Sequence, residues 1–359
     1  MNGFGHLEQY DLKLIAKSPV FIGSGREYNK RDFYFDEENK KVHFINIPKM
    51  MSELRKKGLV DEYEKFILCR PDESLNDFFN DFNLKEEIDS MTDYTADAAD
   101  AIKEGDPFAS VMQFMRDERY RPYIPGSSLK GCLRTALLWL FIKSNERKVN
   151  DNKDVKKIEA EYLNTLNLYK KDPNNEINSI MRGISISDSL PIDNSRMILT
   201  KKIELYPTGK DNDINLIREA VSPGTVINFK LTIDKSVASN LNINLIMDAV
   251  KNYASYYKKT YISSFYIPDY KKVISYDNFI VLGGGSGYFG KNIIYPIYCK
   301  NGVNGKKQAV KRVSKIMQER YEGHYHEKDI DLGISPHIIK YTKYQSLLYQ
   351  YGICEVVIN

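Results

Sequence analysis

The chain has 359 residues, which is longer than one small domain needs and leaves room for two. Hydrophobic residues make up 42% and charged residues 28%, values that are typical of a globular protein and exclude a largely disordered one. The formal net charge of +4 identifies no partner, because a mean conceals how the charges are distributed.

The first hundred residues predict strands followed by short helices. Apolar residues alternate over 10–16 and predict a strand with one apolar face, and the glycines that follow it predict a loop. Segments 32–35 and 41–47 predict a hairpin, and Pro48 then stands where a helix can begin. Residues 61–106 include fifteen acidic and four basic residues, and the apolar side chains among them predict short helices rather than disorder.

The clearest predicted element is a helix that starts after Pro125. Its apolar residues recur at helical spacing and predict a buried stripe made of Leu129, Leu133, Ala136, Leu137 and Leu140. Ser127 or Ser128 can cap the free amides of the first turn.

The second half of the chain predicts five strands and one long helix. The strands are expected at 184–190, 196–206, 225–234, 279–282 and 353–358, and the helix at 241–257. The polar stretch 208–215 indicates a linker, which divides the chain into an N-terminal domain (1–210) with an acidic helical insertion and a C-terminal domain (211–359). This mixture predicts an α+β fold.

Three glycine-rich segments share one chemistry. Glycine leaves no side chain to obstruct an approaching polymer, and amides at the start of a helix favour an anion. The candidate RNA-binding residues are Gly23, Ser24, Gly25 and Arg26; Gly126, Ser127, Ser128, Lys130 and Arg134; and Gly283, Gly284, Gly285, Gly287 and Lys291. The alternatives are a hairpin bend for the first segment and a helix cap for the second. The third matches neither a phosphate-binding loop nor a dinucleotide fold.

A basic stretch overlaps the third segment. Residues 251–315 include twelve basic and two acidic residues, and ten tyrosines lie between 253 and 298. Such a stretch can neutralise phosphates and stack unpaired bases, or it can be a solvated face beside a tyrosine-rich core.

Other site classes find little support. The four cysteines are far apart and form no CxxC motif, and no signal peptide is expected, which favours a reduced, cytoplasmic protein without a membrane segment. His324 and His326 could bind a metal, but an exposed polar loop is the preferred interpretation. We therefore expect no metal and no cofactor.

Residues 123–134, YIPGSSLKGCLR, resemble the RAMP superfamily of CRISPR systems. Residues 14–25 resemble its first strand and glycine loop, and 182–189, 219–227 and 282–287 make the fifth subunit of the type III-A Csm complex the most similar member. The resemblance implies two ferredoxin-like, RRM-related domains with helical insertions. It implies a subunit that caps the 3′ part of the CRISPR RNA (crRNA) at the end of the backbone filament and supports crRNA maturation without catalysis. The implied partners are crRNA, the backbone RAMP subunit, the small helical Csm subunit and host nucleases.

Two alternatives stay open. An endoribonuclease of the same superfamily would need an acid or base near the scissile phosphate, for which His43 or Tyr28 is a candidate. A purely structural subunit would use its charged segments to contact neighbouring subunits without binding RNA.

Overall fold

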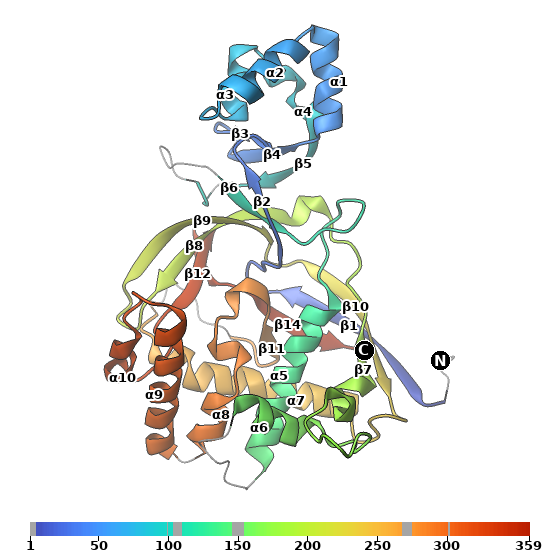
Figure 1. Cartoon of the computed structure of the whole chain (residues 1–359), viewed down its shortest axis with the longest axis vertical. Coiled ribbons are helices and arrows are strands. Elements are labelled where there is room, and N and C mark those ends of the chain that lie inside the picture. The colour runs from blue at the N-terminus through green and yellow to red at the C-terminus, as the bar shows by residue number, and fades with distance from the viewer. Residues whose placement is uncertain (1–4, 99, 103–109, 146–153, 268–274, 301) are drawn as a thin grey trace.

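The structure is a computed structural model that describes residues 5–98, 100–102, 110–145, 154–267, 275–300 and 302–359 (Figure 1). A small lobe with helices α1–α4 stands above a larger body, and two sheets run through the molecule (Figure 1). The mixture of helices and antiparallel strands confirms the predicted α+β class.

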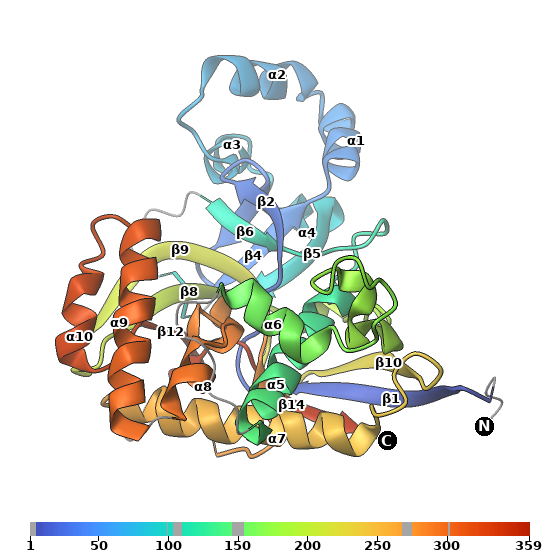
Figure 2. The same cartoon turned by 60° about the horizontal axis from the view of Figure 1, so that its bottom comes forward.

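The first sheet forms the centre of the body. Its order is β11 (Phe279–Val281), β14 (Ile353–Ile358), β1 (Leu7–Ala16), β10 (Val226–Asp234) and β7 (Ile184–Ile186), and every neighbouring pair is antiparallel. Leu12, Leu14 and Ala16 of β1 are fully buried, as their alternation predicts. Helices α5 (Gly126–Ser144) and α7 (Ile243–Thr260) pack together beneath this sheet (Figure 2).

The second sheet joins the lobe to the body. Its order is β2 (Gly23–Asn29), β6 (Ser110–Phe114), β9 (Asp211–Val221), β8 (Met197–Leu205), β5 (Thr92–Asp97), β4 (Lys41–Ile45) and β3 (Phe33–Asp36). β12 (Ile339–Tyr344) pairs with β8 and with β13 (Leu347–Gln350). The curved β8 and β9 cross the top of the body (Figure 1).

The other helices cover these sheets. In the lobe, α1 (Ile47–Lys57), α2 (Val60–Cys69), α3 (Leu75–Asp81) and α4 (Ile88–Met91) enclose an aromatic core that contains Phe66, Phe78 and Phe79. In the body lie α6 (Val155–Leu163), α8 (Ile294–Cys299), α9 (Gly302–Arg320) and α10 (Asp329–Leu332). No helix in the described parts of the chain combines the length and the apolar character needed to cross a bilayer.

Most predictions from local periodicity are confirmed, including the first strand, the hairpin, the helices after Pro48 and Pro125, and the closing strand. Three are wrong. The side chain of neither Ser127 nor Ser128 caps α5, because Pro125 takes the cap position. Residues 208–215 are no linker: they form a tight turn and the first part of β9. The sequence also gives no sign of β5, β6 and β12.

The division into domains at residue 210 stays a prediction. Each sheet combines strands from both predicted segments, and β1 lies between β10 and β14. The strands β8 and β9 lie on either side of residue 210 in the sequence. They pair along their length, from Leu205 with Asp211 to Met197 with Val221.

Candidate nucleic-acid interface

The first glycine-rich segment is a strand and not the predicted loop. Gly23, Ser24, Gly25 and Arg26 lie in β2, an edge strand of the second sheet that pairs with β6. The Ser24 hydroxyl donates to Gln113 Oε1 at 2.9 Å, and Gly25 adopts a φ of +83° in open space. An edge strand is left with unpaired backbone groups, which can serve a ligand.

The second segment has a packing role that explains its glycine. A Cβ on Gly126 would collide with the carbonyl oxygens of Ile186 and Ser187. The Gly126 amide donates to Asp188 Oδ1 at 2.8 Å, so that amide is not free for an anion. Ser127 is exposed and Ser128 is half-buried. Of the two basic residues, Arg134 pairs with Glu159 at 2.8 Å, and partial burial lowers the pKa of Lys130.

The third segment packs against the chain just before the first. Gly283, Gly284 and Gly285 form the short helix η6 (Gly283–Gly285), and the Gly284 amide donates to the Phe21 carbonyl at 2.9 Å. A Cβ on Gly283 would collide with the Phe21 carbonyl, and a Cβ on Gly285 with Tyr351. Phe21 therefore brings the first and third segments together. Gly287 adopts a φ of +61° in open space, and Lys291, which ends η7 (Phe289–Lys291), is exposed.

We predict that Gly283→Ala destabilises the protein far more than Gly287→Ala. Both glycines have a positive φ, so both substitutions cost roughly 1 kcal/mol in backbone strain. Only Gly283 also faces a backbone carbonyl where the new methyl group would be, and overpacking adds about 1–3 kcal/mol. Urea unfolding of the two variants measures the difference, and equal stabilities would show that η6 does not need close contact with Phe21.

The register of three strands places cationic side chains on one face of the second sheet. Lys340 of β12 pairs with Glu204 of β8, and Arg218 of β9 pairs with Thr200 of β8. Lys202 lies between Thr200 and Glu204 with the alternation of a strand, so these side chains share one face. Lys291 of η7 is not part of the sheet, but its charge also acts on Lys340. We name Lys202, Arg218, Lys291 and Lys340 the cationic cluster.

The electrostatics of the cationic cluster are unfavourable without an anion. Burial, together with the positive charges of Arg218, Lys202 and Lys291, lowers the pKa of Lys340 to about 8. The Lys340 ammonium donates to the Gly284 carbonyl at 3.3 Å, so the cluster borders η6. Glu204 opposes the repulsion, but it also pairs with Lys202.

Arg218 is the least compensated member of the cluster. Its side chain lies over the rings of Phe21 and Tyr351, at 5.1 and 5.6 Å from their centres. The residue is only 7% exposed, and Nε and one terminal nitrogen have no hydrogen-bond partner among the described residues. Because buried guanidinium donors are costly when unpaired, the site is suited to an anion that can accept several N–H groups.

The tyrosine-rich stretch is mainly core. Tyr253, Tyr257, Tyr261 and Tyr295 are buried and pack against Phe289 or Trp139, which supports the alternative that the stretch belongs to the core and not to a stacking surface. Tyr266 is exposed, and Tyr270 lies outside the described residues.

The two candidates for acid–base catalysis lie on opposite faces of a sheet. His43 and Phe44 are consecutive in β4, so their side chains point in opposite directions. The ring of Tyr28 packs on Phe44 at 4.5 Å, whereas His43 contacts Thr92 at 3.3 Å. Burial lowers the pKa of His43 and raises that of Tyr28. The two side chains therefore do not form one catalytic pair.

The loop that contains the histidines is only partly exposed. His324 is at the surface as expected, but His326 is buried beside Asp329 and His337, so the prediction of an exposed polar loop is wrong for this residue.

Comparisons with known proteins agree on one family. The model of the RAMP superfamily matches residues 13–290. The CRISPR protein Csm5 of Streptococcus thermophilus is 34% identical over 299 residues, which are 79% of this chain and 80% of that protein. Csm5 of Enterococcus italicus is 25% identical over 382 residues and 96% of both chains.

Two solved structures have the same fold. One is a chain of the Csm–crRNA–target RNA ternary complex of a type III-A CRISPR-Cas system, with a TM-score of 0.65 at 16% identity. The match covers 98% of the present chain and 100% of the chain from the complex. The crystal structure of T. onnurineus Csm5 covers 96% of this chain and 99% of its own, with a TM-score of 0.58 at 17% identity.

Proposed function

The chain belongs to the RAMP superfamily and, within it, to the Csm5 family of type III-A CRISPR complexes, and from this we propose that it is an RNA-binding subunit that holds the 3′ part of crRNA at the end of the backbone filament. In this role it supports crRNA maturation by positioning the RNA for host nucleases, and it contributes no catalytic group. Its partners are crRNA, the backbone RAMP subunit and the small helical Csm subunit, and it acts in the cytoplasm.

The cationic cluster carries this proposal. Three cations act on Lys340 beside η6, and one of them, Arg218, is buried with unpaired donors. A phosphodiester supplies both of the missing parts, a negative charge and several acceptor oxygens. The glycines beside it allow a sugar-phosphate chain to come close to the backbone.

The proposed binding does not depend on the base sequence of the RNA. Phosphate contacts position an RNA but do not identify its bases. In RNA-guided effectors, pairing between guide and target supplies the specificity, so a subunit of this kind needs no base-reading pocket. We place β2 and the start of α5 along the same RNA path, with Arg26 and Lys130 as further phosphate contacts.

A pH titration tests whether RNA binds at the cationic cluster. The pKa of Lys340 is about 8 in the folded chain, below the ordinary 10.5, so its charge is lost between about pH 7 and pH 9. A bound phosphate favours the charged form, and affinity for RNA therefore falls as pH rises. The expected loss is about tenfold by pH 9, measured by fluorescence anisotropy with a single-stranded crRNA 3′ fragment.

Lys340→Arg is the matched control, because arginine stays charged over this range. Its affinity should change little between about pH 7 and pH 9. The same tenfold loss in Lys340→Arg would place the titrating group elsewhere, and absence of RNA binding at low salt would contradict the proposed function itself.

A further inference from the structure

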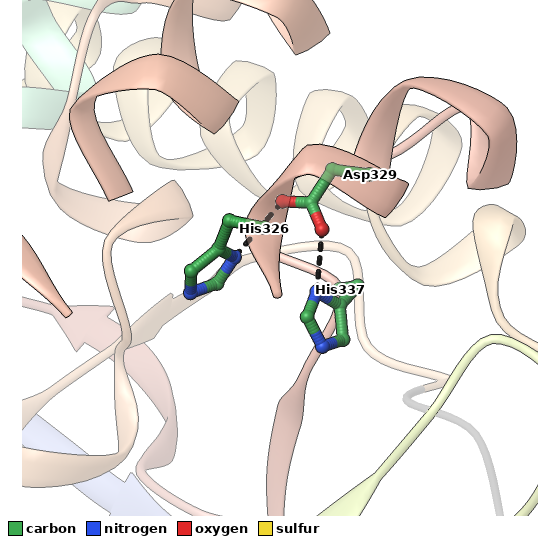
Figure 3. A group of neighbouring side chains, drawn as sticks. All are labelled: His326, Asp329 and His337. Carbon is green, nitrogen blue, oxygen red and sulfur yellow. Dashed lines mark hydrogen bonds and ion pairs between the residues drawn. The ribbon is translucent and has the colours of Figure 1, made fainter. Parts of the chain in front are cut away.

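Three side chains in the C-terminal part of the chain form a buried cluster (Figure 3). They are His326, Asp329 and His337, which are 3%, 0% and 7% exposed. Each residue offers one atom that could bind a metal, and these three atoms all lie within 4.8 Å of one another. His326 and Asp329 come from η8 (His326–Lys328) and α10, and His337 from the segment before β12.

Both imidazoles turn the same atom toward the carboxylate. His326 Nδ1 lies 3.0 Å from Asp329 Oδ2, and His337 Nδ1 is hydrogen-bonded to Oδ1 (Figure 3). The Nε2 atoms of both rings point away from Asp329 (Figure 3). The two Nδ1 atoms and the carboxylate therefore face one another inside the protein.

We propose that His326, Asp329 and His337 bind a divalent transition-metal ion of the zinc type through the two Nδ1 atoms and the carboxylate. Two imidazoles and a carboxylate are a donor set that Zn²⁺ accepts, with a fourth position for water. In the bound state each imidazole carries its proton on Nε2 instead of Nδ1. Neighbouring ligands on a tetrahedral Zn²⁺ are about 3.3 Å apart, so the separation of 3.0 Å at His326 needs only a small adjustment, and His337 moves further.

The surroundings hold the ligands in position. The Ser335 hydroxyl donates to Asp329 Oδ2, and the Ser314 hydroxyl donates to the His326 carbonyl at 2.6 Å. The Tyr295 hydroxyl accepts from the Ser335 amide at 2.9 Å and donates to its carbonyl at 2.7 Å. Such outer contacts orient metal ligands before the ion arrives.

The ion would join two segments that are separate along the chain. It would connect η8 and α10 to His337, which lies two residues before β12 and three residues before Lys340. We therefore assign it a structural role, which orders the strand that carries part of the cationic cluster. The site does not depend on RNA binding, so either proposal can fail without the other.

Metal titration of the purified, chelator-treated full chain tests the site. We expect a single Co²⁺ per chain with the intense visible absorption of a tetrahedral site, displacement by Zn²⁺, and a rise in the thermal midpoint with added Zn²⁺. His326→Gln and His337→Gln should each weaken binding by more than about tenfold. His324→Gln is the matched control, because His324 is exposed and outside the cluster, and it should bind like the wild type.

The metal titration of the wild-type chain tests the proposal even if one of the variants fails to fold. Absence of tetrahedral Co²⁺ binding in the wild type would overturn the proposal and leave Asp329 as the centre of a hydrogen-bond network. Undiminished binding in folded His326→Gln and His337→Gln would also overturn it, because the ion would then sit elsewhere.

Discussion

Arg218→Met is expected to weaken RNA binding by about tenfold or more while the free chain remains at least as stable as the wild type. The methionine keeps an unbranched apolar stem between Phe21 and Tyr351 but removes the buried charge, whose desolvation lowers the pKa of Arg218. Replacing a buried charge with a well-packed apolar side chain is often neutral or stabilising. RNA would lose a multidentate phosphate contact.

RNA affinity measured at several salt concentrations separates this loss from a general loss of charge. Each phosphate contact contributes about 0.7 to the slope of log affinity against log salt for a single strand, so Arg218→Met should reduce the slope by about that amount. Arg55→Met is the control, since Arg55 is exposed on α1 in the lobe, and it should change neither affinity nor slope.

The opposite combination would contradict this role. If Arg218→Met unfolded more easily and bound RNA as well as the wild type, the guanidinium would be a structural element of the sheet. Thermal unfolding of the same samples supplies the stability measurement.

Glu219→Gln should be the most destabilising substitution, with a loss of about 3–5 kcal/mol in the free energy of unfolding. Glu219 is fully buried, where Oε1 accepts from Arg116 and Oε2 accepts from the Phe114 amide at 2.9 Å. The Arg116 guanidinium also lies over the Tyr94 ring at 3.8 Å. Glutamine leaves that guanidinium, which is only 3% exposed, without a counter-ion.

Equilibrium unfolding in urea checks this value, and the single tryptophan, Trp139, provides a buried fluorescent probe. Asp11→Asn is the control, because the Asp11–Lys230 pair is 59% and 56% exposed, and solvent screens such a surface pair so that its loss has little effect on stability. Similar small effects in both variants would show that the pair between Arg116 and Glu219 is dispensable.

The neighbouring residues Arg218 and Glu219 differ in their ion pairing, and the sequence alone does not reveal this difference. Glu219 opens the segment 219–227, which carries part of the family resemblance, and Arg218 directly precedes it, but nothing in the sequence says that one is paired and the other is not. The strand β9 points them to opposite faces, where Glu219 meets Arg116 and Arg218 meets other cations. Lys291 was predicted as a contact from its glycine-rich neighbourhood, whereas Lys202, Arg218 and Lys340 were not.

The sequence by itself determined the elements whose signals are local. The alternation of Leu12, Leu14 and Ala16 specified a strand, and the apolar spacing after Pro125 specified α5. Both patterns depend only on residues that are close together in the sequence. The motifs of residues 123–134 also specified the family. The glycines at 126 and 283 were found, although their close contacts were not.

Only the tertiary structure decided which distant residues meet. The pairing of β1 with β14, the register of β12 on β8 and the meeting of His326 with His337 depend on hydrogen bonds and burial between segments far apart in the chain. A shift of one residue in such a register would turn every side chain to the other face. The cationic cluster and the buried histidines therefore follow from long-range packing, which residue spacing does not encode.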